Sequence, residues 1–267
     1  MMRYTESINV SSTHSPTLME QHEEAYQQLI VTAREDSGVV GLILGGSRGK
    51  GIPTTAASDY DISIIAQNEV IEGVTIKYKA LSSPTGLDIS CMSEQGLSMY
   101  GVWGSDTMWA RYGFAHTKAV IDKTRRLQAW IDEQEFIPEP AKSDAIKQSL
   151  DGYLNYTHRS FKSLRDRRTP AAHLASCDAM PLLITFLFAV EGRVRPYNEY
   201  IEWELGVHPL ENLRAIPPAV FMKKISTVLV SGDEATQKEL YALVREVANR
   251  NDIGKKVLAS WDGYYFG

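Results

Sequence analysis

The sequence predicts an α/β N-terminal domain followed by an all-α C-terminal helical bundle. Short runs of β-branched residues, separated by Gly-rich or polar turns, recur through residues 38–122. Beyond Pro138 and Pro140, apolar residues recur at helical spacing almost to the C-terminus. We therefore place the domain boundary at these prolines, which gives an N-terminal domain of residues 1–137 and a helical domain of residues 138–267.

The N-terminal domain is expected to open with a helix and to continue with strands. Residues 18–35 place apolar side chains near helical spacing after a Ser/Thr/Pro-rich lead. Five segments then have strand character, namely 38–44, 61–66, 74–81, 87–93 and 119–122. A short helix that ends near Glu135 completes the domain.

The C-terminal half reads as a bundle of amphipathic helices. An apolar stripe runs through Ile146, Leu150, Tyr153, Leu154, Thr157, Phe161 and Leu164. Further helices are expected at 171–191, 197–206, 217–229 and 233–250. Aromatic residues end the chain at 261–266 and predict a docked C-terminus, for which a second subunit in a homodimer is one partner. The five tryptophans, Trp103, Trp109, Trp130, Trp203 and Trp261, are expected to pack in the core or between domains.

Composition narrows the functional classes. The 267 residues carry 33 acidic and 28 basic side chains, a net charge of −5, which argues against a broad nucleic-acid footprint. The two cysteines cannot form a disulfide framework, as expected in a reducing compartment. Residues 1–17 lack the apolar segment of a secretory signal, and the longest apolar stretch, 180–190, is too short to cross a bilayer. We expect a cytoplasmic protein without membrane association.

The segment from residue 41 to 65 carries the chemistry. A buried strand is expected to end in the turn Gly45-Gly46-Ser47, where backbone N–H groups can approach an anion closely. Asp59 and Asp61 then enter the next strand, and side chains two residues apart on a strand point to the same face. Paired carboxylates repel each other unless a cation lies between them, and hard oxygen ligands suit Mg²⁺ shared with phosphates. The pattern predicts a site for a nucleoside triphosphate.

Other phosphate-binding motifs do not fit. A Walker A loop requires Gly where Leu44 stands and Ser or Thr where Gly51 stands. A dinucleotide fingerprint that starts at Gly49 requires a third glycine where Thr54 stands.

The Gly-Gly-Ser turn, the run Ser58-Asp59-Tyr60-Asp61, and a later acid between apolar residues, Leu87-Asp88-Ile89, together resemble the DNA polymerase beta-like nucleotidyltransferase superfamily. The strings at 109–124, 153–164 and 188–210 are similar to a bacterial branch of small nucleotidyltransferases with a helical C-terminal domain, related to the aminoglycoside nucleotidyltransferases. The resemblance covers roughly residues 38–210. The second glycine before Ser47 and the insert at 49–57 depart from the pattern.

The resemblance implies a small mixed sheet with helices packed against it. It also implies transfer of a nucleoside monophosphate, usually AMP from ATP, to a hydroxyl group, with release of pyrophosphate. Asp59 and Asp61 would hold one or two Mg²⁺ ions, and Asp88 would complete the metal site or act as general base.

The resemblance further implies phosphate contacts from the turn and from the residue before the acid pair. Gly46 and Ser47 would bind the β- and γ-phosphates, and Ser58 would supply a second hydroxyl contact. Arg48 is also predicted to contact phosphate, although a basic residue in such a loop is often merely exposed.

One helix face in the second domain is a second source of site residues. Asp151, Asn155, Arg159, Lys162 and Asp166 share the polar side of one helix. If that face overlooks the cleft, Lys162 binds the triphosphate and Asp151 is an alternative general base to Asp88. At the later junction of Arg193, Arg195, Tyr197 and Asn198, structural capping and ligand contact remain alternatives.

The leading hypothesis is a Mg²⁺-dependent nucleotidyltransferase that uses ATP or another nucleoside triphosphate. Its acceptor is a small hydroxylated molecule, with aminoglycoside-like antibiotics, and hence antibiotic resistance, as the best-known class. One alternative is a protein-AMPylating enzyme of the toxin–antitoxin type. Another is a non-catalytic nucleotide-binding protein, against which the three intact acids Asp59, Asp61 and Asp88 argue.

Overall fold

The computed structural model describes residues 17–55, 57–83 and 86–267. The N-terminal lead, on which the expectation about a secretory signal rests, lies almost wholly outside the described residues. The chain divides into two compact units. The first, here the sheet unit, holds the chain up to Leu97 together with Lys118–Arg125. The second, here the helical unit, holds Ser98–Thr117 and Arg126–Gly267.

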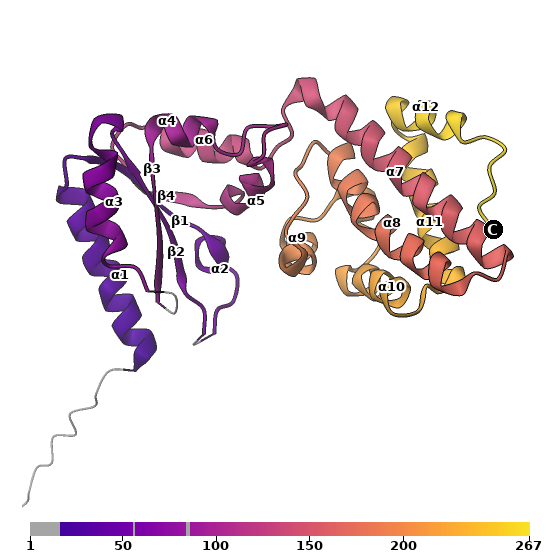
Figure 1. The fold of residues 1–267 in the computed structure, drawn as a ribbon, viewed down its shortest axis with the longest axis horizontal. Helices are drawn as coiled ribbons and strands as arrows, with labels where there is room; N and C mark the ends of the chain where they lie inside the picture. Colours follow the sequence, from indigo (N-terminus) through magenta and orange to yellow (C-terminus); the bar gives the residue numbers. More distant parts are fainter. Residues whose placement is uncertain (1–16, 56, 84–85) are drawn as a thin grey trace, which may run out of the picture. The chain divides into compact units, whose positions relative to one another are not determined.

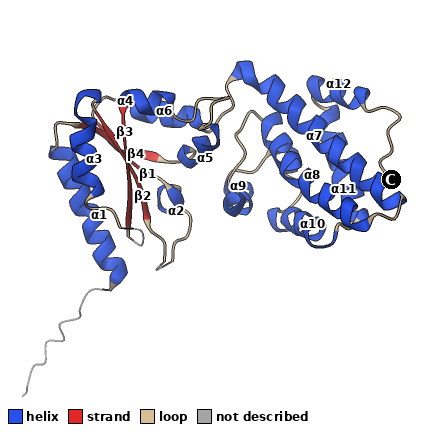
Figure 2. Ribbon diagram, in the orientation of Figure 1, coloured by secondary structure: helices blue, strands red, loops and turns tan. Residues whose placement is uncertain are grey.

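The sheet unit is built on a small mixed sheet, as predicted (Figure 1, Figure 2). Its strands are β1 (Val39–Leu44), β2 (Tyr60–Ala66), β3 (Leu87–Ser93) and β4 (Lys118–Asp122), in the order β3-β2-β1-β4. Strands β2 and β3 are parallel, whereas β1 runs antiparallel to both β2 and β4. Four of the five predicted strands are therefore confirmed.

Two helices cover one face of this sheet (Figure 1). Helix α1 (Leu18–Glu35) begins with a capping box formed by Thr17 and Glu20, and it buries Tyr26, Leu29, Ile30 and Ala33. Helix α3 (Ile71–Lys79) buries Val74 and Tyr78 in the same apolar cluster. Alternate residues of β2, namely Tyr60, Ile62 and Ile64, point into this cluster, so Asp61 and Ser63 belong to the opposite face.

The prediction of a strand at 74–81 is wrong, because these residues lie largely in helix α3. The buried residues Val74 and Tyr78 are four apart, which is a helical spacing. The parallel pairing of β2 with β3 supplies the physical reason, since parallel neighbours need a crossover connection, usually a helix. The β-branched residues Val74, Thr75 and Ile76 hid that helix in the sequence.

The helical unit contains a bundle dominated by two long helices. The border helix is α4 (Glu94–Met99), and the remaining elements are α5 (Arg111–Phe114), α6 (Leu127–Gln134), α7 (Glu139–Arg165), α8 (Thr169–Val190), α9 (Ile201–Val207), α10 (Pro218–Ser231), α11 (Glu234–Asn249) and α12 (Asp252–Ser260). Helices α7 and α8 are joined by a turn of three residues and bury a shared apolar core. The predicted helical bundle is confirmed.

The division into units differs from the predicted boundary at residue 137. Residues 98–117 and 126–137 belong to the helical unit, where Tyr112 and Ile137 join the core of α7 and α8. Only β4 and its flanks return to the sheet unit, because β4 pairs with β1 along the edge. A boundary placed at the prolines does not separate residues 98–117 from the sheet unit, because this segment contains no proline.

Helix α8 is long and apolar enough, by length and composition alone, to cross a membrane. About half of its most apolar window, 56%, is buried within the structure. Leu183, Ile184 and Leu187 contribute to the same core as α7. A core helix of a water-soluble fold passes the same test, so the helix is weak evidence for a membrane span.

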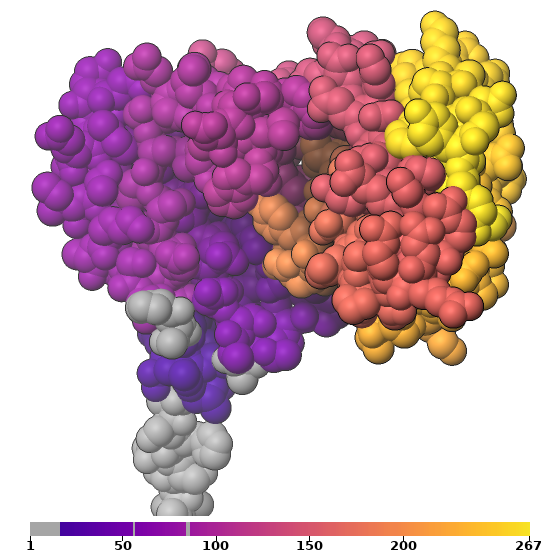
Figure 3. Space-filling model, turned by 45° about the vertical axis from the view of Figure 1, so that its right-hand side comes forward, coloured from indigo at the N-terminus to yellow at the C-terminus, as the bar shows by residue number. Residues whose placement is uncertain are grey.

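The aromatic C-terminal segment docks on the helical unit of its own chain (Figure 3). Phe266 stacks on Tyr241 of α11 with ring centroids 4.4 Å apart. The indole N–H of Trp261 donates to Asp151 of α7 at 2.8 Å. Docking is thus confirmed with an intramolecular surface, and the predicted homodimer remains a prediction.

Candidate functional site

The predicted acids gather on the face of the sheet opposite α1 and α3. Asp61 on β2 lies directly across from Asp88 on β3 in the parallel register, so both side chains emerge on the same face. Asp59 precedes β2 by one residue and has the same parity as Asp61. One step along, the hydroxyl groups of Ser63 and Ser90 lie 3.0 Å apart. Polar side chains therefore line this part of the sheet.

The glycine turn lies directly against these acids. The amide of Gly45 donates to the backbone carbonyl of Asp61 at 2.7 Å. Gly46 opens the short helix α2 (Gly46–Gly49) with a positive φ of 57°. A Cβ atom at Gly46 would lie 1.8 Å from Oδ2 of Asp61, closer than any real contact. Only glycine lets the turn backbone approach the carboxylate this closely.

The carboxylates lack a compensating positive charge. Burial raises the pKa of Asp61 above its ordinary value, and the negative charges of Asp59 and Asp88 raise it further. Within the described residues, no ion pair engages Asp59, Asp61 or Asp88. Asp61 is thus close enough to Asp59 and Asp88 to be repelled by both, and no ion pair of the described residues offsets this repulsion.

This donor set fits a divalent cation that completes its shell from a substrate. The described part of the chain contains no group of three or more His, Cys, Asp or Glu side chains that could by itself hold a metal ion. Mg²⁺ in phosphate-transferring sites is commonly held by one or two carboxylates plus phosphate oxygens rather than by a full protein cage. Asp59 and Asp61 are the pair suited to that role, with Asp88 beside them.

Arg48 holds the backbone of the loop that carries Ser58 and Asp59. Its Nε donates to the carbonyl of Asp59 at 3.0 Å, and its Nη2 donates to the carbonyl of Ser58 at 3.1 Å. The guanidinium also lies 4.0 Å from the centroid of the Tyr60 ring, a cation–π contact. These contacts assign Arg48 a positioning role, and its predicted contact with phosphate remains a prediction.

The sequence analysis did not predict the contacts by which helix α1 holds Tyr60. The hydroxyl of Tyr60 donates to Glu23 of α1, and the Tyr60 ring stacks on Tyr26 with centroids 4.6 Å apart. The alternation of side chains along a strand could have indicated this contact. A residue between two acids on one face must point to the opposite face, where the helices pack. Helix α1 thus anchors the residue that separates Asp59 from Asp61.

The two predicted serine ligands differ in their surroundings. Ser58 accepts the amide of Thr55 at 3.0 Å, so its oxygen helps to shape the loop before the acids. Among the described residues, no hydrogen bond engages the hydroxyl of Ser47, which lies in the turn next to Gly46. The structure therefore leaves the Ser47 hydroxyl available.

Lys162 and Asp151 belong to the helical unit, on α7. Lys162 lines a cleft of about 590 Å³ within that unit, together with Arg159, Arg168 and Asp178. Asp151 accepts the Trp261 indole N–H and so helps to hold the C-terminal segment. Lys162 and the acid cluster thus belong to different units, and the predicted contact of Lys162 with the nucleotide remains a prediction.

Comparison with known proteins gives little by sequence. No family model matches the chain, and no curated protein sequence matches it. Among solved structures, the chain is similar to a nucleotidyltransferase-like protein from Exiguobacterium sibiricum. The two share 12% sequence identity over 88% of this chain and 78% of the other, with a TM-score of 0.42.

Proposed function

We propose that this protein is a nucleotidyltransferase, which transfers a nucleoside monophosphate from a triphosphate to a hydroxyl group and releases pyrophosphate. The observation that carries the proposal is the juxtaposition of acids and glycine turn at the start of β2. Asp61 and Asp88 lie side by side on two adjacent parallel strands, Asp59 lies near Asp61, and Gly46 brings a backbone turn against Asp61. A glycine turn against uncompensated acids suits a metal-bound triphosphate.

Each element of the site has a separate task in this proposal. Asp59 and Asp61 would hold Mg²⁺, which when bound neutralises charge on the triphosphate and polarises the reacting phosphate. The turn at Gly46 and the hydroxyl of Ser47 bind the β- and γ-phosphates. The acceptor oxygen bonds to the α-phosphorus, the bond to the β-phosphate oxygen breaks, and pyrophosphate leaves with that electron pair.

Asp88 is the preferred general base for the acceptor proton. Its side chain is exposed and lies on the same face as Asp61, so an acceptor can reach it. The carboxylate of Asp151 is already engaged by the Trp261 indole. Asp88 therefore receives the proton as the new oxygen–phosphorus bond forms, and Asp151 is the alternative.

The acceptor in this proposal is a small hydroxylated molecule that carries amines, as aminoglycoside-like antibiotics do. Carboxylates without counter-charges attract cations, and the chain has a net charge of −5. Both features favour a positively charged acceptor over an anionic one. Transfer to a protein hydroxyl is the alternative, and it uses the same acids.

Pyrophosphate release tests the proposal directly. The full chain is incubated with Mg²⁺, each of the four nucleoside triphosphates in turn, and a panel of aminoglycosides, lincosamides and purified proteins. We expect release with one class of acceptor, and loss of that release in Asp59→Asn and Asp61→Asn. Asp262→Asn, which removes an exposed acid at the C-terminus, is the matched control and should release pyrophosphate as the wild type does.

The acceptor arms also decide between the two versions of the reaction. Release that depends on an aminoglycoside supports the small-molecule acceptor, whereas release that depends only on a protein supports AMPylation. The proposal fails if no triphosphate binds with Mg²⁺, as measured by calorimetry with an analogue that cannot be cleaved between its α- and β-phosphates.

A further inference from the structure

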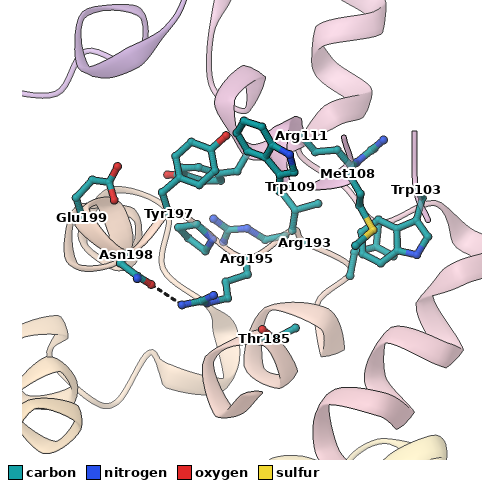
Figure 4. A pocket seen from close by; sticks show the side chains of 14 residues that line it. Trp103, Met108, Trp109, Arg111, Thr185, Arg193, Arg195, Tyr197, Asn198 and Glu199 are labelled. Atoms are coloured by element: carbon teal, nitrogen blue, oxygen red, sulfur yellow. Dashed lines mark hydrogen bonds between the residues drawn. The ribbon is translucent and has the colours of Figure 1, made fainter. Parts of the chain in front are cut away.

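The helical unit contains a second candidate binding site, a pocket of about 610 Å³ (Figure 4). This volume is in the range of small-molecule sites, roughly 300–1,000 Å³. Its walls come from the 3-10 turn Met108–Ala110, from α5 and α8, and from the segment 193–199 that follows α8. All of the lining residues belong to the helical unit, whereas the three acids belong to the sheet unit.

Among the described residues, no ion pair engages Arg195, which lines the pocket. One terminal nitrogen donates to the side-chain oxygen of Asn198, as Figure 4 shows, while the buried Nε has no hydrogen-bond partner in the described structure. Burial lowers the pKa of Arg195, and no neighbouring carboxylate offsets this effect. A desolvated guanidinium without an anion is costly for the protein to maintain.

The neighbouring Arg193 provides an internal comparison. It forms an ion pair with the buried Glu204 and donates to the carbonyl of His208 at 2.8 Å. Arg193 is therefore a structural residue, whereas Arg195, two positions later, has no such partner. The only acid that lines the pocket is Glu199, whose side chain is exposed and forms no ion pair with Arg195 within the described residues.

A second arginine of the lining, Arg111, is also incompletely satisfied. Its side chain is 6% exposed, and its terminal nitrogens donate to the carbonyls of Gly101, Glu133 and Phe136. Its Nε is buried without a partner, as in Arg195. Buried polar atoms in native proteins are nearly always hydrogen-bonded, so two such arginines in one pocket point to a ligand with acceptor oxygens.

Aromatic faces complete the pocket. Trp109 is 67% exposed, although its expected place was in the core or between domains. Tyr197, another lining residue, is held by an edge contact to Tyr112 at 5.3 Å and by a hydrogen bond with the Gly113 backbone. Trp103 and Met108 lie at the other end of the pocket (Figure 4). These surfaces suit a flat apolar ring.

We propose that this pocket binds an aromatic carboxylate, with the carboxylate on Arg195 and the ring between Trp109 and Tyr197. A guanidinium matches a carboxylate in geometry and charge, since two parallel N–H groups meet two oxygens. Backbone carbonyls already engage the terminal nitrogens of Arg111, so Arg195 is the arginine left to pair with a ligand, and one guanidinium suits a single negative charge better than the double charge of a phosphate. This site goes beyond nucleotidyl transfer and does not depend on it.

Calorimetry with four probes of equal ring size tests the ligand chemistry. The full chain is titrated with naphthylacetate, the neutral naphthylacetamide, the cationic naphthylethylamine and naphthyl phosphate. We expect naphthylacetate to bind at least about tenfold more tightly than the amide, because the amide cannot form the charge-assisted pair. Equal binding of acid and amide, preference for the amine, or preference for the phosphate would each overturn the proposal.

Variants then locate the site. Arg195→Gln should weaken naphthylacetate binding at least about tenfold, and Trp109→Ala about fivefold, since the ring loses one stacking face. Trp109 is exposed, so its truncation keeps the test informative if Arg195→Gln unfolds. Arg250→Gln removes an exposed arginine that does not line the pocket and is the matched control. Unchanged affinity in Trp109→Ala and in a folded Arg195→Gln contradicts the assignment.

These experiments distinguish a failure of the pocket proposal from a failure of the proposed nucleotidyl transfer. Asp61→Asn should leave naphthylacetate affinity unchanged, because Asp61 belongs to the other unit. Loss of naphthylacetate binding in that variant would contradict the independence of the pocket.

Discussion

The buried carboxylate of Glu204 and the half-buried carboxylate of Asp61 have opposite surroundings. Glu204 in the helical unit accepts hydrogen bonds from Tyr112 at 2.7 Å and His116 at 2.9 Å, and it pairs with Arg193. Burial alone would raise its pKa, but the hydrogen bonds and the charges of His116 and Arg193 lower it below the ordinary value. Within the part of the chain that the structure describes, Asp61 has no such partners, and its pKa is raised.

The difference separates structure from function in physical terms. A carboxylate with several partners holds elements together, and Glu204 joins α5, α9 and the segment after α8. An uncompensated carboxylate costs stability, which a protein retains where a ligand supplies the missing charge. Arg193 and Arg195 repeat the contrast with the opposite sign.

The largest expected effect is on nucleotidyl transfer. Asp61→Asn should lower turnover by about a thousandfold, equivalent to about 4 kcal/mol, because the site loses a metal ligand. Its free energy of unfolding without metal should rise by about 0.5–1 kcal/mol, since the raised pKa means that ionised Asp61 destabilises the fold. Pyrophosphate release and urea unfolding measure the two effects. A variant that loses activity and stability together would remove the contrast with Glu204.

The next effect is on stability alone. Glu204→Gln should lower the free energy of unfolding by about 3 kcal/mol, because Arg193 is left buried without a counter-charge. Urea unfolding of Glu202→Gln, an exposed acid on the same helix, is the control and should match the wild type. A loss below about 1 kcal/mol in Glu204→Gln would mean that this network is not the structural counterpart described above.

A pair of glycine substitutions sharpens the geometry of the acid site. Gly46→Ala should cost about 2 kcal/mol, from positive φ and from the clash with Asp61, and should abolish Mg²⁺-dependent nucleotide binding. Gly51→Ala has a similar φ, 70°, but its Cβ would meet nothing within 4 Å. It should therefore cost only about 1 kcal/mol and leave binding intact. Equal effects on binding would show that the contact with Asp61 is unimportant.

The smallest effect concerns pH. Burial and then the nearby His116 lower the pKa of His208 below its ordinary value of 6.5. As the pH falls below about 6.5, the unfolded chain therefore takes up a proton before the folded chain does, and stability decreases. The contribution of Glu204 is lost at still lower pH, as the pH falls through its lowered pKa. Urea midpoints between about pH 7 and pH 5 should decline less in His208→Asn than in the wild type.

Much of the sheet unit could be predicted from sequence. The alternation of Asp59, Tyr60 and Asp61 determines faces on a strand, and the Gly-Gly-Ser turn marks the end of β1. Helix α3 was missed because β-branched residues obscured a helix that only the parallel pairing of β2 and β3 requires. Local preference alone does not contain that long-range constraint.

In the helical unit, the sequence does not predict which charged side chains are paired and which are not. The pairing of Arg193 with Glu204, and the absence of a pairing for Arg195, arise from contacts between segments distant in the chain. The exposure of Trp109 and the excursion of residues 98–117 into this unit have the same origin. Composition and spacing identify these residue types without saying which of them are compensated.

Calorimetry of an uncleavable ATP analogue with Mg²⁺, on the wild type and on Asp61→Asn, tests the central claim most directly. The claim is that the uncompensated acids of the sheet unit receive their positive charge from a metal-bound nucleotide. We predict Mg²⁺-dependent binding in the wild type, at least about a hundredfold weaker in Asp61→Asn and unchanged in Arg195→Gln. Binding that persists without Mg²⁺, or that is equal in the wild type and Asp61→Asn, would contradict the claim.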